Sequence, residues 1–297
     1  RTNPGNDTWL SLSAAKDIFN RLKKQNVCEI LILSGEVHPN SLRRETWFNL
    51  IYDLCELALA MGFLPHTNAG PLSFEEMKKL KEVNVSMGLM LEQLTPDLLQ
   101  TVHKHAPSKV PELRLQQLQW AGELKIPFTT GLLLGIGETK QDCWDTLAAI
   151  SQLHKNYQHI QEVILQPHSP GTKQSFDAEP FNPHQLPEVI AKAREILPED
   201  IKIQIPPNLV KDKQWLLSCI EAGARDLGGI SPIDEVNPDY PHIQEQELRE
   251  MLHPQGWDLV PRLPVYPQFD GWLLGDLEIG VKKWREKFGL KPSNSHY

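Results

Sequence analysis

A glycine-rich stretch at residues 129–138, Thr-Thr-Gly-Leu-Leu-Leu-Gly-Ile-Gly-Glu, could bring a ligand close to the backbone. Gly131, Leu133 and Gly135 alternate, so an extended strand would place them on one face. Glycine weakens a strand interior, and its repeated use on one face indicates that another group approaches the backbone there. Glu138 then ends the turn with a carboxylate. Taken alone, the pattern also suits an ordinary tight turn between a strand and a helix.

Polar side chains recur directly after the predicted strands. These residues are Gly35 and Glu36, His66 and Asn68, Ser86 and Glu92, Gln166 and His168, Asn208, and finally Asp234, Glu235 and Asn237. A single residue of this kind is more often a turn or cap residue than a site residue. Their recurrence at the ends of parallel strands, however, predicts a pocket for a polar organic ligand.

Three other chemistries find little support in the residues. His66 and His168 could pair as metal ligands, but no third ligand is placed, so we predict no metal site among these residues. The sequence has no GxSxG nucleophile motif. Lys202 is the lysine that lies well inside a predicted strand, and it falls near the strand's N-terminal end, where a Schiff-base lysine of a barrel is not expected.

Composition sets wider bounds on the function. The 297 residues are 40% hydrophobic and 23% charged, as is typical of a globular protein of one large or two small domains. A net charge of -8 gives no electrostatic reason to expect nucleic acid as a partner. No apolar run approaches the length of a membrane span. The four cysteines, Cys28, Cys55, Cys143 and Cys219, are far apart, which favours a reduced, cytoplasmic protein.

Strand and helix patterns alternate through most of the chain. Strands are predicted at 28–34, 63–68, 83–91, 126–134, 161–166 and 201–205, with a last short one at 225–229. Helices are predicted at 12–25 and 47–61, after the caps at Ser73, Thr95 and Thr139, from Pro111, and at 273–288. This alternation predicts an α/β fold, a TIM-type barrel of parallel strands. We expect the barrel to span 1–234 and a proline- and aromatic-rich extension, 235–297, to wrap it.

Several of these motifs resemble those of radical S-adenosylmethionine (SAM) enzymes. Gly131-Leu-Leu-Leu-Gly135-Ile-Gly-Glu138 resembles their GxIxGxxE motif, and Arg114 has the spacing of the arginine that holds the SAM carboxylate. Ser34-Gly35-Glu36 resembles the motif that meets the SAM amino group. The resemblance implies that SAM is bound by Gly35, Glu36, Ser86, Glu92, Arg114, Gly131, Gly135 and Glu138.

Longer segments resemble one branch of that family, the CofG-type subunit of 7,8-didemethyl-8-hydroxy-5-deazariboflavin synthase. They are Leu64–Gly70, Ser86–Glu92, Ile126–Gly131, Ile205–Leu209 and Gly228–His242. The resemblance implies that a 5′-deoxyadenosyl radical drives cyclisation of a hydroxybenzyl-ribitylaminopyrimidinedione adduct with loss of ammonia. It implies catalytic roles for His66, His168, Asp234 and Glu235, and substrate contacts for Asn68, Gln166, Asn208 and Asn237.

The sequence departs from the family at its cluster motif. Radical SAM enzymes bind a 4Fe-4S cluster through CxxxCxxC, and the chain as printed has no such spacing. Residues 1–7 resemble those that follow the motif, so we expect the first strand and the cluster ligands upstream of Arg1, and no activity from the printed chain alone. The resemblance also implies a reductant such as ferredoxin or flavodoxin and a CofH-type partner subunit. Two alternatives stay open: another radical SAM enzyme, or an inactive barrel without a cluster.

Overall fold

The computed structural model describes residues 9–170, 180–210, 212–230, 239–241 and 243–290 of the chain. The chain forms two compact units, one made of 1–87 with 262–297 and the other of 88–261. Each unit is built from parallel strands that are neighbours in chain order, with helices between them. The predicted α/β class is therefore confirmed. The predicted domain boundary at residue 234 stays a prediction.

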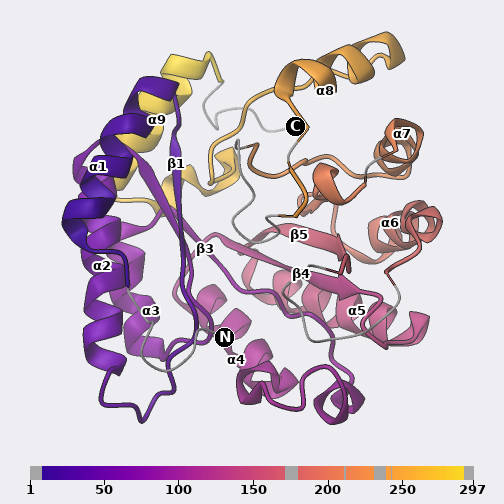
Figure 1. The fold of residues 1–297 in the computed structure, drawn as a ribbon, viewed down its shortest axis with the longest axis horizontal. Helices are drawn as coiled ribbons and strands as arrows, with labels where there is room; N and C mark the ends of the chain where they lie inside the picture. The colour runs from indigo at the N-terminus through magenta and orange to yellow at the C-terminus, as the bar shows by residue number, and fades with distance from the viewer. Residues whose placement is uncertain (1–8, 171–179, 211, 231–238, 242, 291–297) are drawn as a thin grey trace. The chain divides into compact units, whose positions relative to one another are not determined.

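The first unit carries strands β1 and β2 and the first two residues of β3. Its elements are α1 (Leu12–Leu22), β1 (Glu29–Leu33), α2 (Arg44–Ala60), β2 (Leu64–Asn68), α3 (Phe74–Leu80), β3 (Ser86–Gly88) and α9 (Asp276–Phe288). In Figure 1, α1, α2 and α9 lie close together beside the first two strands. The register pairs Leu33 with Asn68 and His66 with Ser86, so the ends of these strands lie side by side.

Local signals explain where the helices of this unit begin and end. Ser11 caps α1, and Ser73 forms a capping box with Glu76 at the start of α3. Such reciprocal bonds satisfy amide groups that a helix N-terminus leaves without partners. Gly62 follows α2 with a φ of +90°, a conformation that glycine adopts without strain.

Strand β1 has one buried and one exposed face. Ile30 and Ile32 are buried, whereas Leu31 and Leu33 are 46% and 42% exposed. The period-two alternation of a strand accounts for the difference, because neighbouring side chains point to opposite faces. Exposed leucines on one face leave an apolar surface on this strand.

The C-terminal segment belongs to the first unit. Leu64 and Val85 pack in a cluster with apolar residues of this segment, among them Leu263, Val265 and Phe269, and with the buried face of α9. Hydrophobic burial of this kind is the main favourable term in folding. Residues 262–290 are therefore an integral part of the unit's core.

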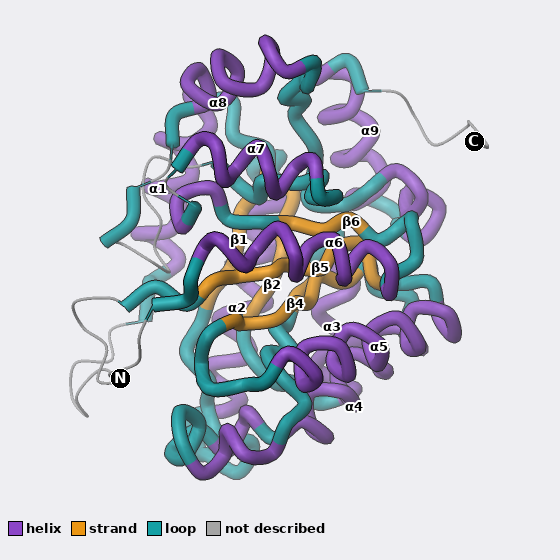
Figure 2. Tube along the Cα trace, turned by 90° about the vertical axis from the view of Figure 1, so that its right-hand side faces the viewer, coloured by secondary structure: helices purple, strands orange, loops and turns teal. Residues whose placement is uncertain are grey.

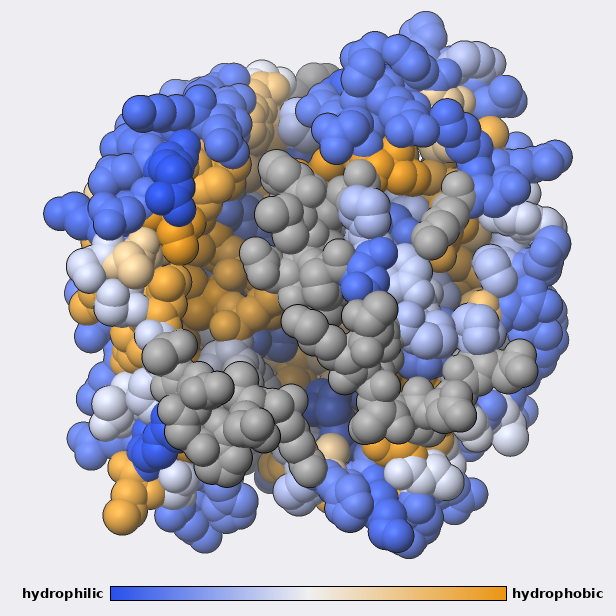
Figure 3. Space-filling model, in the orientation of Figure 1, coloured by the Kyte–Doolittle hydropathy of each residue, from blue (hydrophilic) through white to orange (hydrophobic). Residues whose placement is uncertain are grey.

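The second unit has three strands covered by helices. Its elements are α4 (Pro111–Glu123), β4 (Phe128–Leu134), α5 (Lys140–Tyr157), β5 (Ile160–Pro167), α6 (Leu186–Ile196), β6 (Lys202–Gln204), α7 (Lys213–Glu221) and α8 (Glu245–Leu252). Each of α4 to α7 contacts the next, and α6 packs on β6 (Figure 2). Helix α8 buries Leu248 and Leu252 and presents a hydrophilic outer surface in Figure 3.

Several predicted elements differ in length from those in the structure. The strand expected at 83–91 is regular only over Ser86–Gly88. Beyond it, Leu89 and Glu92 still donate backbone hydrogen bonds to β4, but Glu92 has a φ of +66°, which ends the extended geometry. The strand expected at 225–229 is a single bridge between Asp226 and Gln204.

The helical predictions also need two corrections. The helix expected after Thr95-Pro96 is a short 3₁₀ helix, Pro96–Gln100. The helix expected from residue 273 begins at Asp276, preceded by Gly275 at a φ of +59°. Across the described residues, no helix has both the length and the apolar character needed to cross a membrane.

Candidate functional site

The glycine turn after β4 is held by the carboxylate that ends it. Both Glu138 oxygens accept backbone hydrogen bonds, from Gly135 N at 2.6 Å and from Ile136 N at 2.8 Å. Gly135 and Gly137 have φ values of +85° and +113°. Because those values are strained for any residue with a Cβ, the turn depends on its glycines. Glu138 thus fixes the backbone of the turn, whatever else it contacts.

The close approach predicted at the two glycines is real, and protein atoms make it. A Cβ on Gly131 would lie 2.3 Å from the Ile164 carbonyl oxygen and 2.9 Å from Met90 Cε. A Cβ on Gly135 would lie 2.9 Å from Phe181 Cβ. The first contact comes from the neighbouring strand β5, which pairs Gly131 with Ile164. These glycines are therefore required by the packing of β4 and of the turn that follows it.

Arg114 and Glu92 come together, as their joint assignment to one cofactor requires. The Arg114 side chain, on α4, is 2% exposed, and its Nη1 lies 3.9 Å from Glu92 Oε1. Its Nε donates to the Ser108 carbonyl at 3.0 Å, and its Nη1 donates to the Met90 carbonyl. Arg114 therefore anchors the segment that leads from β3 to Glu92.

Other basic side chains surround the Glu92 carboxylate. Lys109 forms an ion pair with it, and His103 Nε2 lies 3.2 Å from Oε2. Burial, with a contribution from Arg114, lowers the pKa of His103. Lys109 and Arg114 therefore supply positive charge beside Glu92.

Three more predicted residues of the second unit have defined positions. His168 lies just beyond β5, is buried, and donates its backbone N–H to the Leu134 carbonyl at 2.7 Å. Burial lowers the pKa of His168, although the nearby Glu138 acts in the opposite direction. Gln166 is half-buried on β5. Asn208 is buried, and its Nδ2 donates to the Tyr240 carbonyl at 2.9 Å.

In the first unit, Gly35 and Glu36 follow β1 in an exposed loop. A Cβ on Gly35 would meet no atom within 4 Å, so its backbone borders open space. The Glu36 side chain lies over Gly70, where a Cβ would come within 2.4 Å of Glu36 Cγ. Gly70 was not predicted as a site residue, although its place two residues after Asn68 was a usable signal. Asn68 itself is half-buried at the end of β2.

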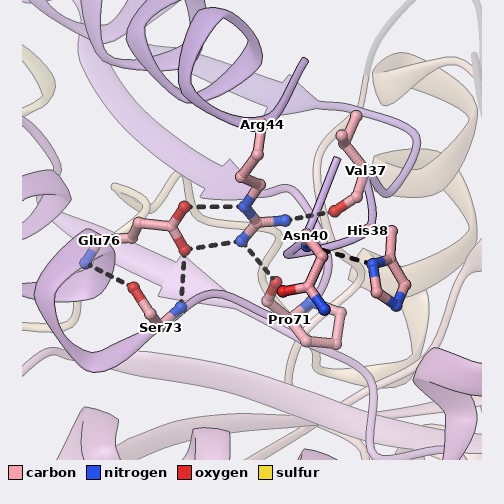
Figure 4. A network of polar contacts seen from close by, with 7 residues as sticks. All are labelled: Val37, His38, Asn40, Arg44, Pro71, Ser73 and Glu76. Carbon is pink, nitrogen blue, oxygen red and sulfur yellow. Dashed lines mark hydrogen bonds and ion pairs between the residues drawn. The ribbon is translucent and has the colours of Figure 1, made fainter. Parts of the chain in front are cut away.

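The main residue that the sequence analysis missed is Arg44, at the start of α2 (Figure 4). Its Nη1 donates to the Val37 carbonyl at 2.6 Å, and its Nη2 donates to the Pro71 carbonyl at 3.0 Å. Its Nε and Nη2 donate to the two oxygens of Glu76, at 2.8 Å and 2.6 Å. One guanidinium thus joins the loop after β1, the loop after β2 and the start of α3. A cation in the first turn of a helix is unfavourable, and this oddity could have identified it.

His66, on β2, lies in a buried chain of hydrogen bonds. Its Nδ1 is 2.7 Å from Ser86 Oγ, and that hydroxyl donates to the Pro264 carbonyl at 2.5 Å. The ring is 8% exposed and Ser86 is 0% exposed. Burial, with a contribution from the charge of Arg262, lowers the pKa of His66 to about 3. His66 is therefore neutral at every physiological pH.

Asp234, Glu235 and Asn237 lie outside the residues that the structure describes, and their predicted roles stay predictions. Among the described residues the structure brings together Glu92 with Arg114, and His66 with Ser86. His66 and His168 fall in different units. Within the same described ranges, no cluster of three or more His, Cys, Asp or Glu side chains could hold a metal ion.

The described residues suit SAM better than they suit an iron-sulfur cluster. An exposed carboxylate at Glu36 can accept hydrogen bonds from an ammonium group, and the Gly35 backbone borders open space. A cluster requires closely spaced thiolates, and the described cysteines are separate residues without such a grouping. The described residues are therefore suited to contact SAM and not to ligate the cluster.

The chain resembles known proteins along nearly all of its length. Residues 1–150 match the family model described as the radical SAM superfamily. A 7,8-didemethyl-8-hydroxy-5-deazariboflavin synthase of Trichormus variabilis is 77% identical over 286 residues, which are 96% of this chain and 84% of that relative. One from Trichodesmium erythraeum is 60% identical, over 98% of this chain and 91% of the relative.

Solved structures show the same fold at low identity. HydG, a maturase of the FeFe hydrogenase, superposes with a TM-score of 0.72 at 15% identity, over 95% of this chain and 64% of that one. Methylornithine synthase (PylB) superposes with a TM-score of 0.60 at 15% identity, over 83% of this chain and 72% of that one. The fold is thus the predicted radical SAM barrel type, whose family uses SAM and a 4Fe-4S cluster. The chain belongs to the 7,8-didemethyl-8-hydroxy-5-deazariboflavin synthase family of radical SAM enzymes.

Proposed function

We propose that this chain supplies the barrel in which a hydroxybenzyl-ribitylaminopyrimidinedione adduct cyclises to the deazaflavin chromophore with loss of ammonia. The carrying observation is 77% identity, over 96% of the chain, to a synthase of that name. Bound SAM, with the cluster, supplies the 5′-deoxyadenosyl radical that begins the reaction. The residues of this chain then have to bind SAM, orient the adduct and move a proton.

Within this proposal, two parts of the chain bind SAM. Glu36 accepts from the SAM ammonium beside the open backbone of Gly35. Arg114 and Glu92 serve the carboxylate and the ribose, with Arg114 anchoring the segment that carries Glu92. The glycine turn from Gly131 to Glu138 presents its backbone to the adenosyl group. What supports this is the match of these residues to the family motifs, together with the contacts described above.

The remaining predicted residues face the substrate in this proposal. A neutral histidine can accept a proton on a ring nitrogen, and burial favours the neutral form of both His66 and His168. Asn68, Gln166 and Asn208 offer amides to the ribityl hydroxyls and the pyrimidinedione. We assign the same task to Asp234, Glu235 and Asn237 on the strength of the sequence alone.

We further propose that the printed chain needs cluster ligands that are not among its own residues. Its four cysteines have no CxxxCxxC spacing, so the chain as printed would not cleave SAM. A reductant such as ferredoxin or flavodoxin, a functional pairing with a CofH-type subunit and a cytoplasmic location complete the proposal. These last points rest on the family resemblance.

The decisive experiment compares two forms of the protein under anaerobic reducing conditions. The chain is joined to a segment bearing CxxxCxxC, reconstituted with iron and sulfide, and supplied with SAM and the adduct. We expect the deazaflavin chromophore, 5′-deoxyadenosine and ammonia from the joined chain, and none of them from the printed chain. Liquid chromatography with mass spectrometry measures the first two products.

Variants then test the substrate assignment within the active form. Asp234→Asn should lower deazaflavin formation more than tenfold while 5′-deoxyadenosine still forms, because a site built to hydrogen-bond its substrate depends on each partner. Lys140→Ala, which breaks an exposed ion pair with Glu188, is the matched control. SAM cleavage without any deazaflavin from the unmodified joined chain would overturn the proposed reaction. A normal product ratio in Asp234→Asn would remove that residue from the site.

A further inference from the structure

The hydrogen bonds of Ser86 determine which nitrogen of His66 carries the proton. A hydroxyl has one proton to donate, and Ser86 donates it to the Pro264 carbonyl, which can only accept. The oxygen of Ser86 therefore acts as an acceptor toward His66 Nδ1 at 2.7 Å. The neutral ring must then carry its proton on Nδ1, which leaves the lone pair on Nε2.

Three separate elements of the fold hold this hydrogen-bonded arrangement in place. Strand β2 carries His66, β3 carries Ser86 directly opposite it in register, and Pro264 comes from the C-terminal segment. That segment is tied down by the apolar cluster that includes Leu263 and Val265. Because Ser86 is 0% exposed, its hydroxyl is not accessible to a ligand.

The electrostatic environment of His66 also favours the neutral form of its ring. The charged group that acts on His66 is Arg262, whose positive charge opposes protonation, and burial acts in the same direction. Among the described residues, Ser86 is the side chain to which the ring is hydrogen-bonded, and Nε2 has no such bond. A neutral imidazole with its Nε2 lone pair open is the form that a general base requires.

We infer that Ser86, held by the Pro264 carbonyl, is a positioning residue that keeps His66 in the Nδ1–H tautomer with Nε2 available as a base. This inference replaces the SAM contact that the family resemblance implied for Ser86. It concerns the resting protein and needs no cofactor. Its catalytic consequence, that His66 Nε2 takes a proton during ring closure, rests on the proposed function.

Nuclear magnetic resonance of the chain labelled with ¹⁵N at histidine tests the tautomer directly. The nitrogen shifts of a protonated and an unprotonated ring atom differ widely, and the spectrum of His66→Gln identifies the His66 signals. We expect Nδ1–H with bare Nε2, unchanged from pH 8 to pH 5. Ser86→Ala should shift the population toward Nε2–H, and Ser86→Thr, which keeps the hydroxyl, should restore the wild-type pattern.

Ser218→Ala is the matched control, because Ser218 also donates to a backbone carbonyl, that of Gln214, but in an exposed hydrogen bond. It should leave the His66 signals unchanged. An Nε2–H or doubly protonated ring in the wild type, or identical spectra for wild type and Ser86→Ala, would overturn the inference. A separate assay of the joined, cluster-loaded chain decides the catalytic consequence: deazaflavin formation retained in His66→Gln removes the base role and leaves the tautomer result intact.

Discussion

Buried histidines tie the stability of this protein to pH at the scale of single residues. Burial lowers the pKa of His159 to about 3, as it does for His66, with opposing and reinforcing contributions from Leu118 and His154. In the unfolded chain a histidine has a pKa near 6.5. Between pH 6.5 and 3 the unfolded state therefore binds protons that the folded state does not. The contribution of these histidines to stability is therefore complete above about pH 6.5 and is lost as the pH falls.

We expect the free energy of unfolding to fall by about 1.4 kcal/mol per pH unit for each such histidine in that range. Urea unfolding at pH 7.5, 6 and 5 measures the slope. His159→Gln should reduce this slope by about 1.4 kcal/mol per pH unit, the contribution of one proton. A wild-type stability that is flat from pH 6 to 5, or equal slopes for the wild type and His159→Gln, would contradict the prediction.

Sequence reasoning could locate a residue whose contacts are local, although the role of Glu138 toward SAM stays a prediction. Glu138 was identified from its place after the glycines, and the structure shows both of its oxygens on that turn. It failed where partners are distant in sequence. Arg44 bonds to residues 27 and 32 positions away, and Ser86 to one 178 positions away. No local pattern carries that information.

At the scale of elements, the Arg44 network links two loops and a helix that the sequence presents separately. The side chains of Arg44 and Glu76 are 12% and 17% exposed, so their ion pair is largely buried. Burial raises the pKa of Glu76, but hydrogen bonds from Arg44 and Ser73 outweigh it and lower the pKa overall. Removing one partner of a buried pair leaves the other partner's charge uncompensated.

We therefore expect Arg44→Ala to lower the free energy of unfolding by on the order of 3 kcal/mol. The free energy of unfolding of Arg44→Lys should lie between those of the wild type and Arg44→Ala. Lysine keeps the charge but cannot reach Glu76, Val37 and Pro71 together. Hydrogen exchange of residues 34–40 should rise in both variants, since the loop with Gly35 and Glu36 loses its anchor. Chemical unfolding and exchange mass spectrometry measure the two effects.

Lys140→Ala provides the comparison for this prediction. The side chains of Lys140 and Glu188, which form an ion pair, are 57% and 60% exposed. Exposed ion pairs contribute roughly 0–1 kcal/mol to the free energy of unfolding. An Arg44→Ala variant no less stable than Lys140→Ala would show that the network does not hold these loops.

The length of an element was harder to predict than its existence. The capping boxes at Ser73 and Thr139 were readable because they are made of residues three apart. The backbone beyond β3 was not readable, because Glu92, four residues after the strand ends at Gly88, adopts a positive φ for which glutamate has no local preference. Tertiary contacts from Arg114 and Lys109 hold it there.

At the scale of the whole molecule, alternation of strands and helices was enough to predict the α/β class, because parallel strands require helical crossovers. The alternation of strands and helices did not predict the division of the chain into two units. The described residues after 261 join the N-terminal strands through apolar contacts between Leu64, Val85 and the C-terminal cluster. Such pairings between the ends of a chain leave no mark in local periodicity.

The four thiols, two in each unit, give a prediction for the whole chain. Burial raises the pKa of Cys28 and Cys55 to about 11 and that of Cys143 and Cys219 to about 12. A raised thiol pKa means that the protonated form persists through neutral pH. At pH 7.5 each thiolate fraction is then on the order of one in a thousand or less. Since the thiolate is both the nucleophile and the iron ligand, these cysteines should be poor at both tasks.

We expect the folded chain to react with iodoacetamide at pH 7.5 at least tenfold more slowly than the same chain in urea, where the ordinary thiol pKa near 8.5 returns. Anaerobic reconstitution of the printed chain should yield far fewer than four irons per molecule. The chain joined to a CxxxCxxC segment is the positive control for reconstitution, and the urea-unfolded chain is the control for alkylation. Mass spectrometry and iron analysis give the two readouts. A stoichiometric 4Fe-4S absorbance from the printed chain would contradict the prediction, because it would require buried, protonated thiols from separate parts of the sequence to gather as thiolates around one cluster.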